Sequence, residues 1–225
     1  MSEHASGART RWGASRPTPM KTRNLLLALL ILALWAATAC SRPPQRNYLD
    51  SLRSYWQGVY TNGGETLYCG RKFRPFDRSV NVEHVYPMSW VTKKLGCGKR
   101  KQCRHNSPRF NLIESDMHNM YPARKDVNQT RGAMVFGIIE GENHKYRGCD
   151  FEVDFRKRRV EPRPEVRGRI ARAMLYMSDE YGLDIYRKQR KMLEKWNRQF
   201  PPDAEEKRHN RAVARIQGKP NPYIR

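Results

Sequence analysis

The segment from Asn81 to Asn128 most limits what this chain can fold into. It combines oxygen ligands, a proton acceptor and cations, and these groups can act together only if the fold brings them into one site. It opens with Asn81-Val82-Glu83-His84-Val85-Tyr86-Pro87 and closes on Asp126-Val127-Asn128-Gln129-Thr130-Arg131-Gly132, with a basic loop at 93–109 between them. Glu83 and Asn128 offer hard oxygen atoms that suit Mg²⁺, and His84 can accept a proton near neutral pH. An arginine of the loop can hold a phosphate oxygen in a bidentate fork. These residue types together favour hydrolysis of phosphodiesters.

A strand is predicted over residues 78–84, because Val80 and Val82 fall on one face. Neighbouring residues of a strand point to opposite faces. Glu83 and His84 can therefore serve one site only if the strand ends or bulges there. The following Tyr86-Pro87 favours an end, since proline cannot donate to the ladder.

The net charge indicates a polyanionic partner. Lys and Arg number 44 against 22 Asp and Glu, which gives a formal charge of +22. Such a field attracts nucleic acid and accelerates the encounter. The alternative is a cationic surface without a specific partner.

The first forty residues are typical of an exported protein. An apolar run, Leu25 to Ala37, follows Lys21 and Arg23 and is too short for a comfortable membrane span. The small residues before Cys40 resemble a cleavage site, so we predict an N-terminal extension and signal peptide over residues 1–40, with lipoprotein cleavage and a lipid anchor at Cys40 as one form. A retained signal anchor is the alternative, and translation can start at Met1 or Met20. Residues 41–50 are predicted to be a linker and residues 51–225 the functional domain.

Four further cysteines, Cys69, Cys97, Cys103 and Cys149, indicate two disulfides in an exported chain. Three pairings are possible. Cys97 and Cys103 flank a short loop and form the natural local pair, which would leave Cys69 with Cys149. The competing hypothesis is a zinc site built from Cys97, Cys103 and His105, although its spacing lacks the usual two tight cysteine pairs.

The remaining pattern predicts a small α+β domain with helices gathered towards the C-terminus. Apolar spacing predicts helices over residues 48–59, 164–181, 184–200 and 203–217, with Gly182 and Gly218 at two of the ends. Alternation from Cys149 to Phe155 predicts a half-buried strand. A short helix capped by Asp126 is predicted over residues 126–131.

Several motifs, in order, resemble the endonuclease I family of secreted or periplasmic bacterial nucleases. They are Glu83-His84-Val85-Tyr86-Pro87, Asp116-Met117-His118-Asn119-Met120-Tyr121-Pro122, Val127-Asn128-Gln129-Thr130-Arg131-Gly132, Arg167-Gly168-Arg169-Ile170-Ala171-Arg172 and Ile216-Gln217-Gly218-Lys219-Pro220-Asn221-Pro222-Tyr223. The resemblance covers residues 51–225 and implies a His-Me finger (ββα-metal) domain.

The same resemblance implies the site. His84 is the expected general base, Glu83 and Asn128 the expected ligands of Mg²⁺, with Mn²⁺ as a substitute, and Arg100 the expected phosphate clamp. Lys99 or Lys101 is the alternative to Arg100, because the intervening loop is shorter here. Asn128 can instead cap a helix or be a glycosylation acceptor. Arg131 is expected to contact the nucleic acid backbone or to form an ion pair with Asp116 or Asp126.

The function expected from these observations is an exported, Mg²⁺-dependent endonuclease, largely without sequence preference, that cuts DNA and RNA to leave 5′-phosphate ends. A monomer without a stable protein partner is expected. One alternative is a non-catalytic, exported lipoprotein that binds nucleic acid. Another is a site-specific HNH-type nuclease, against which the lack of a separate recognition domain argues.

Overall fold

The computed structural model describes residues 47–141 and 145–225. The described residues all belong to one compact unit. Its first helix, α2 (Tyr48–Gly58), begins inside the stretch that the sequence analysis assigned to a linker. The predicted signal peptide and the lipid anchor at Cys40 lie outside the described residues. Among the helices that are described, none has the length and apolar character needed to cross a bilayer.

The described part is a mixture of helices and small sheets, as predicted for an α+β domain. The further helices are α3 (Met88–Leu95), α4 (Arg100–Asn106), α5 (Pro108–Glu114), the 3₁₀ turn η1 (Met117–Asn119), α6 (Lys125–Arg131), α7 (Pro164–Tyr181), α8 (Arg187–Gln199) and α9 (Ala204–Gln217). The strands are β1 (Gly64–Glu65), β2 (Lys72–Phe73), β3 (Val80–His84), β4 (Met120–Arg124), β5 (Val135–Phe136), β6 (Phe151–Asp154) and β7 (Arg159–Pro162). They form the pairs β1–β2 and β3–β4 and a three-stranded sheet in the order β5-β7-β6.

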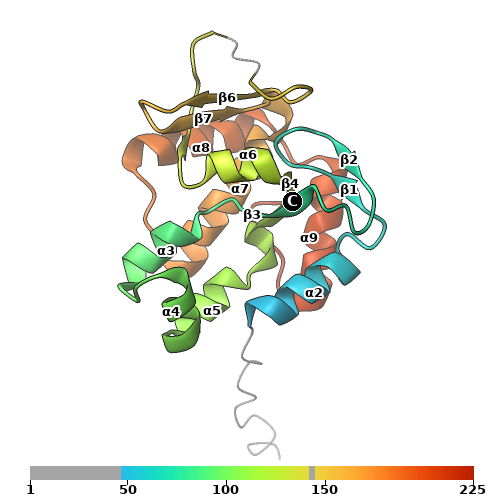
Figure 1. Ribbon diagram of the computed structural model, residues 1–225, viewed down its shortest axis with the longest axis vertical. Coiled ribbons are helices and arrows are strands. Elements are labelled where there is room, and N and C mark those ends of the chain that lie inside the picture. Colours follow the sequence, from blue (N-terminus) through green and yellow to red (C-terminus); the bar gives the residue numbers. More distant parts are fainter. Residues whose placement is uncertain (1–46, 142–144) are drawn as a thin grey trace, which may run out of the picture. The chain divides into compact units, whose positions relative to one another are not determined.

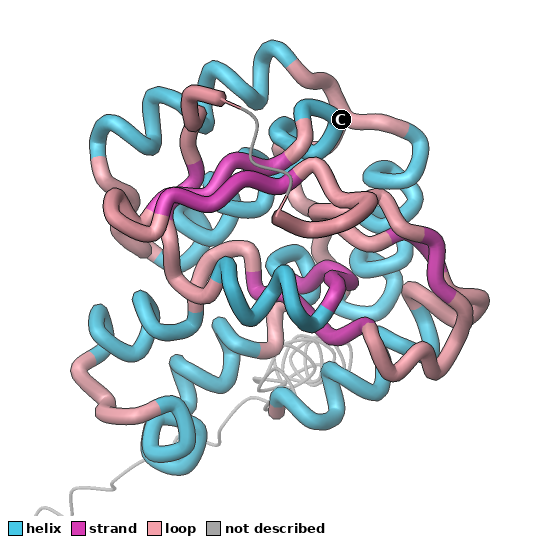
Figure 2. The backbone as a smooth tube through the Cα atoms, turned by 45° about the horizontal axis from the view of Figure 1, so that its top comes forward, coloured by secondary structure: helices cyan, strands magenta, loops and turns pink. Residues whose placement is uncertain are grey.

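A hairpin-like unit made of β3, β4 and α6 lies at the centre of the described fold (Figures 1 and 2). The two strands are antiparallel, with Glu83 opposite Tyr121 and His84 opposite Met120. Helix α6 begins directly after β4 and contacts both strands. Strand β3 ends at His84, as Pro87 indicated. The Glu-His pair therefore stands at the end of a strand, where both side chains can reach one site.

The basic stretch between β3 and β4 was expected to be a loop and is instead mostly helical. Helices α3, α4 and α5 occupy most of it, and they contact one another. Gly96 ends α3 in the left-handed conformation, with φ of 60°, and the Ser107 side chain accepts a hydrogen bond from the backbone of Phe110 to start α5. These local caps separate three short helices. The sequence analysis interpreted this stretch as a loop from its many basic residues, and basic residues are common in helices and loops alike.

Both predicted disulfides are present. Cys97 bonds Cys103, and Cys69 bonds Cys149 across a separation of 80 residues. Because Cys97 and Cys103 are bonded to each other, the zinc hypothesis for them is wrong. The second bond ties the segment before β3 to the start of β6.

Two local expectations need correction. Asp126 does not cap α6: the N-cap is Arg124, and Asp126 lies in the first turn, where it pairs with the Arg124 guanidinium at 2.5 Å. Strand β6 is also more buried than its alternation indicated, since Glu152 is only 3% exposed. Its neighbours Phe151 and Val153, whose side chains point to the opposite face of the strand, are buried as well.

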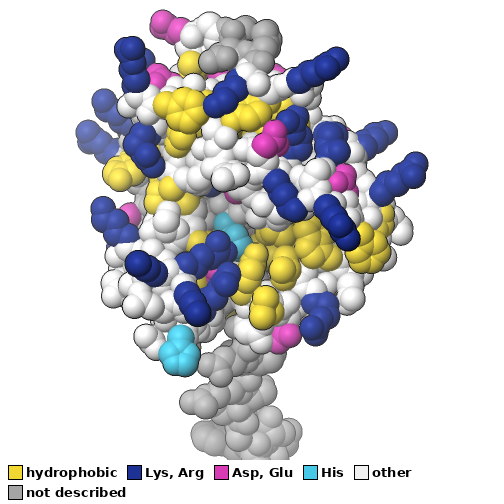
Figure 3. Space-filling model, viewed as in Figure 1, with side chains coloured by type: hydrophobic (Ala, Val, Ile, Leu, Met, Phe, Trp, Pro, Cys, Tyr) yellow, Lys and Arg dark blue, Asp and Glu magenta, His cyan; other side chains and the backbone are white. Residues whose placement is uncertain are grey.

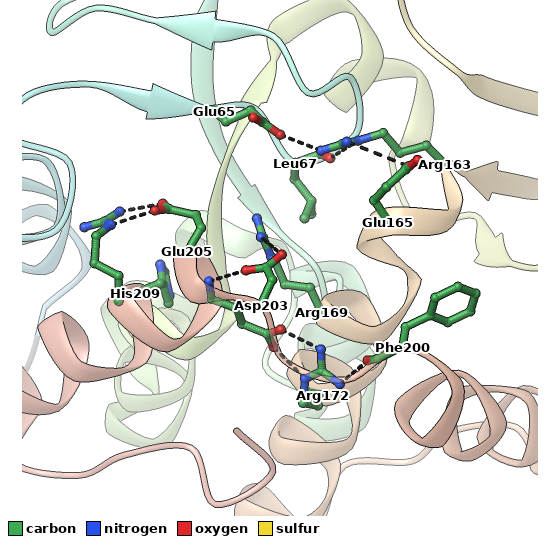
Figure 4. Close-up of polar contacts among 12 residues, drawn as sticks. Glu65, Leu67, Arg163, Glu165, Arg169, Arg172, Phe200, Asp203, Glu205 and His209 are labelled. Atoms are coloured by element: carbon green, nitrogen blue, oxygen red, sulfur yellow. Dashed lines mark hydrogen bonds and ion pairs between the residues drawn. The ribbon is translucent and has the colours of Figure 1, made fainter. Parts of the chain in front are cut away.

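Helix α7 runs through the larger of two apolar cores and is buried on nearly all sides. Its Gly168 lets the Phe200 carbonyl oxygen approach closely, because a Cβ atom here would lie 2.1 Å from that oxygen. Two arginines of α7 bind acids of the α9 region: Arg169 reaches Asp203 at 2.7 Å, and Arg172 reaches Glu206 at 2.5 Å (Figure 4). The second core packs α2 against α9 and β2. Together these contacts fix the surroundings of the β3–β4–α6 unit.

Candidate active site

Glu83, His84, Arg100 and Asn128 line one open cleft of about 600 Å³. Glu83 and His84 come from the end of β3, Asn128 from α6 and Arg100 from the first residue of α4. Residues 83 to 128 span 46 positions in the sequence. The fold brings the four side chains together because α6 packs on β3 and α4 places Arg100 on the same cleft. Lys125 adds a further cation to the cleft wall.

The side chain of Asn128 is oriented by two hydrogen bonds. Its Nδ2 donates to Oδ1 of Asn81 at 2.9 Å and to the Val82 carbonyl at 3.1 Å. Both bonds use the amide nitrogen, so the amide oxygen is left for another partner. Asn128 does not cap α6, since it lies in the interior of that helix. The arrangement suits a residue that presents an oxygen atom to a cation.

Glu83 is 3% exposed and is held by two groups that both bind Oε1. The Tyr68 hydroxyl donates at 2.6 Å, and the Arg131 guanidinium donates at 2.8 Å. Oε2 has no side-chain partner among these bonds and can serve as a ligand. Burial raises the pKa of the Glu83 carboxyl, whereas Arg131 and Tyr68 act in the opposite direction. A cation bound beside it would likewise favour the ionised form.

The His84 ring is held by a backbone group. Its Nε2 lies 3.0 Å from the carbonyl oxygen of Glu114. A carbonyl can only accept, so this contact places the hydrogen on Nε2 and leaves the lone pair on Nδ1. Burial, followed by the nearby Arg100 guanidinium, lowers the pKa of His84 to about 4. The imidazole is therefore neutral at pH 7 and able to accept a proton.

Arg100 stands at the edge of the cleft with a side chain that is 45% exposed. Its Nε donates to Glu114 at 2.5 Å, and its guanidinium lies 5.5 Å from the centre of the Tyr48 ring. The neighbouring Arg104 also binds Glu114, at 2.6 Å, and stacks on the same ring at 4.6 Å. Glu114 itself is fully buried. It therefore holds Arg100 at the cleft, Arg104 beside it and, through its backbone carbonyl, the His84 imidazole.

Arg131 does not lie where a substrate-contacting residue would. Its side chain is 1% exposed, and besides Glu83 it binds the carbonyl oxygens of His84 at 3.1 Å and Val85 at 2.6 Å. The expected ion pair with Asp116 or Asp126 is not formed, since Asp126 pairs with Arg124 and Asp116 accepts from Tyr176 and Tyr181. The structure gives Arg131 a positioning role beneath Glu83.

The sequence analysis missed three residues that shape this site: Tyr68, Asn81 and Glu114. Asn81 stood in the opening motif, and its spacing of two from Glu83 was the available signal. Tyr68 and Glu114 lie 15 and 30 residues from their partners in β3. No local pattern marks such pairs, because the contact exists only once the chain has folded.

The donor set fits a hydrated cation. Within the described residues, no three His, Cys, Asp or Glu side chains gather into a metal-holding group. The cleft instead offers one carboxylate and one amide oxygen, and the rest of its lining leaves room for water. Mg²⁺ dehydrates reluctantly and usually keeps several waters while it binds one or two protein oxygens. Glu83 and Asn128 meet that requirement.

Comparison with known proteins agrees with the geometry. The sequence model of the family described as Endonuclease I matches residues 37–225. A periplasmic deoxyribonuclease of Aeromonas hydrophila is 35% identical over 91% of this chain and 98% of its own length. An extracellular deoxyribonuclease of the same species is 36% identical over 86% of this chain and 96% of its own length. An extracellular ribonuclease of Bacillus amyloliquefaciens is 33% identical over 49% of this chain and 43% of its own length. The chain therefore belongs to the endonuclease I family of nucleases.

Proposed function

We propose that this protein is an exported, Mg²⁺-dependent endonuclease that hydrolyses DNA and RNA without marked sequence preference and leaves 5′-phosphate ends. The observation that carries the proposal is the convergence of Glu83, His84, Arg100 and Asn128 on one open cleft. The antiparallel strands β3 and β4 followed by α6 support a ββα-metal site of the His-Me finger type. A net charge of +22 supports a polyanionic substrate.

Glu83 and Asn128 are the residues that would hold Mg²⁺. Bound there, the ion would neutralise charge on the scissile phosphate and on the leaving oxygen. Arg131 and Tyr68 orient the carboxylate, and Asn81 orients the amide, so both oxygens are set before the substrate arrives. Such preorganisation avoids a cost of ordering during the reaction.

His84 is the proposed general base. The Glu114 carbonyl fixes Nε2–H and leaves Nδ1 to take a proton from the attacking water. The low pKa of the ring keeps it neutral at physiological pH. Arg100 is the proposed phosphate clamp, because its guanidinium is partly exposed at the cleft and held there by Glu114. Lys99 and Lys101 are exposed neighbours on the same turn.

The lack of sequence preference follows from a site that recognises phosphates, which carry no sequence information. Action on DNA is supported by the two Aeromonas relatives, which are named deoxyribonucleases, and action on RNA by the Bacillus relative, which is named a ribonuclease. The same relatives are described as periplasmic or extracellular, which supports export of this chain. A soluble monomer or a lipoprotein anchored through Cys40 is the proposed final form.

The test uses supercoiled plasmid and RNA with either Mg²⁺ or EDTA. Wild-type protein should cut both in Mg²⁺ and neither in EDTA. His84→Ala should slow cleavage by roughly 10²–10⁴-fold, the usual contribution of general acid–base catalysis, while DNA still binds. The matched control is His105→Ala, an exposed histidine on α4, which should cut normally. Plasmid that stays supercoiled in Mg²⁺ but is bound would establish the non-catalytic alternative.

The metal ligands give a second, separate signature. Glu83→Ala and Asn128→Ala should each lower activity and raise the Mg²⁺ concentration needed for half-maximal cleavage. Asn128→Asp should retain more activity than Asn128→Ala, because it keeps an oxygen at about the same place. Equal Mg²⁺ dependence in wild type and in both alanine variants would place the metal elsewhere.

A further inference from the structure

An aromatic groove adjoins the catalytic cleft, with a volume of about 640 Å³. It lies between α2 and the segment that joins β2 to β3. Its aromatic lining is Tyr48, Trp56, Tyr60, Phe73 and Phe76. The groove and the cleft share Asn81, Val82 and Arg100, so the two hollows lie side by side. On this face of the molecule, Figure 3 shows a continuous apolar patch with Lys and Arg side chains along its edges.

The floor of the groove consists of buried aromatic side chains, and its rim is exposed to solvent. Tyr60 and Phe73 are 3% and 8% exposed and belong to the apolar core beneath α2. Tyr48 and Trp56 are half-buried and present part of their rings. Phe76 stands at the rim and is 99% exposed. These side chains offer flat apolar faces from the floor to the rim.

Phe76 gives the strongest indication that the groove has an occupant. Its side chain is fully exposed to water. Its backbone has φ of 65°, in the left-handed region that residues other than Gly, Asn and Asp rarely adopt. Packing within the domain therefore does not account for a phenylalanine at this position. Backbone strain of this kind collects at functional sites.

The charge around the groove selects the class of occupant. Arg74 and Arg100 line it, and the Arg104 guanidinium lies 4.6 Å above the Tyr48 ring. The one acid in the lining, Asp77, is paired with Arg71 at 3.1 Å. Flat apolar faces flanked by cations match the alternating bases and phosphates of a nucleic acid strand. An apolar peptide would satisfy the rings but not the arginines.

We propose that this groove binds unpaired bases of the substrate strand next to the scissile phosphate. The proposal rests on the proposed function and names the substrate class that the site is built to hold. Bases in a duplex already stack on one another and cannot present their faces to Phe76 and Trp56. The groove therefore engages single-stranded or frayed segments, while Arg100 holds the phosphate where the groove meets the cleft.

The experiment measures strand binding in EDTA, so that it does not depend on cleavage. The probes are a single-stranded oligodeoxynucleotide and the same strand with abasic sites in place of its bases. Phe76→Ala should weaken binding of the intact strand by roughly tenfold, the order expected for one lost stacking contact, and should leave binding of the abasic strand unchanged. Because the Phe76 side chain is 99% exposed, removing it deletes little packing, and the variant should fold as the wild type does.

The matched control is Phe155→Ala, an exposed phenylalanine that follows β6 and is 56% exposed. It should bind both strands as the wild type does. An equal loss on intact and abasic strands, or no loss on either, would overturn the proposal.

A cleavage assay in Mg²⁺ then separates the two proposals. Phe76→Ala should raise KM for the single strand by a larger factor than KM for the annealed duplex, whereas Phe155→Ala should change neither. If wild-type protein fails to cut while the base-dependent binding holds, the proposed function fails and the groove proposal stands.

Discussion

Replacing Arg131 with methionine tests the positioning role that the structure assigns to this residue. Methionine fills a similar volume but cannot donate to Glu83, His84 or Val85, which Arg131 now binds at 2.6–3.1 Å. Both charged partners are almost fully buried, at 1% and 4% exposure of their side chains. Removing one partner of a buried ion pair typically costs about 3–5 kcal/mol. In a domain of this size that corresponds to a fall of about 6–20 °C in the midpoint of thermal unfolding.

A double-mutant cycle isolates the contribution of the Arg131–Glu83 ion pair to the free energy of unfolding. Glu83→Gln leaves Arg131 buried without its carboxylate, so this variant should be destabilised too. The double variant Arg131→Met with Glu83→Gln carries neither charge and should be more stable than Arg131→Met alone, with a coupling energy of about 1–3 kcal/mol. Urea unfolding should be followed in EDTA with the disulfides intact, because a cation bound at Glu83 would offset part of the loss.

Arg211→Met is the matched control, because Arg211 is an exposed arginine of α9. It should change the free energy of unfolding little, as surface substitutions usually do. The reasoning would be refuted if Arg131→Met unfolded like the wild type and only bound DNA more weakly. That result would favour contact between Arg131 and the nucleic acid, which is one of the two roles that the sequence left open.

The remaining predictions concern pH, covalent cross-links and orientation of the amide ligand. Burial lowers the pKa of His209 well below its usual value. Below about pH 6.5 the unfolded chain therefore binds a proton at His209 that the folded state excludes. This residue alone should lower the free energy of unfolding by about 1.4 kcal/mol between pH 7.5 and pH 5.5. In urea unfolding, the free energy of unfolding of His209→Gln should depend less steeply on pH. Replacing Cys69 and Cys149 with alanines should lower the free energy of unfolding by about 4.5 kcal/mol, and replacing Cys97 and Cys103 by about 2.4 kcal/mol. The first loss is larger because the Cys69–Cys149 bond closes the longer loop. Equal losses in unfolding measurements would contradict the loop-entropy argument. Asn81→Ala removes one of the two acceptors that orient the Asn128 amide and leaves the Val82 carbonyl as the other. It should raise the Mg²⁺ concentration needed for half-maximal cleavage, whereas Asn81→Asp should stay close to wild type.

Local features of the chain were determined by the sequence alone. Helix α7 was predicted at its observed bounds, since its apolar spacing, Pro164 and Gly182 all act within the helix or one residue beyond it. Asp203 and Gly218 likewise bound α9 as expected. The end of β3 at His84 followed from the proline three residues later. Each of these signals depends on neighbours in the sequence, so no knowledge of packing was needed.

Tertiary structure decided which groups support the reactive side chains. Arg131 was predicted either to contact nucleic acid or to pair with Asp116 or Asp126, but it pairs with Glu83, 48 residues away in the sequence. Glu114 had no predicted role, yet its carbonyl fixes His84 and its carboxylate holds Arg100. Such a buried charge is stable only beside its partner, and folding alone brings the partner there. The sequence therefore predicted which residues form the candidate site, and packing determined which groups orient them.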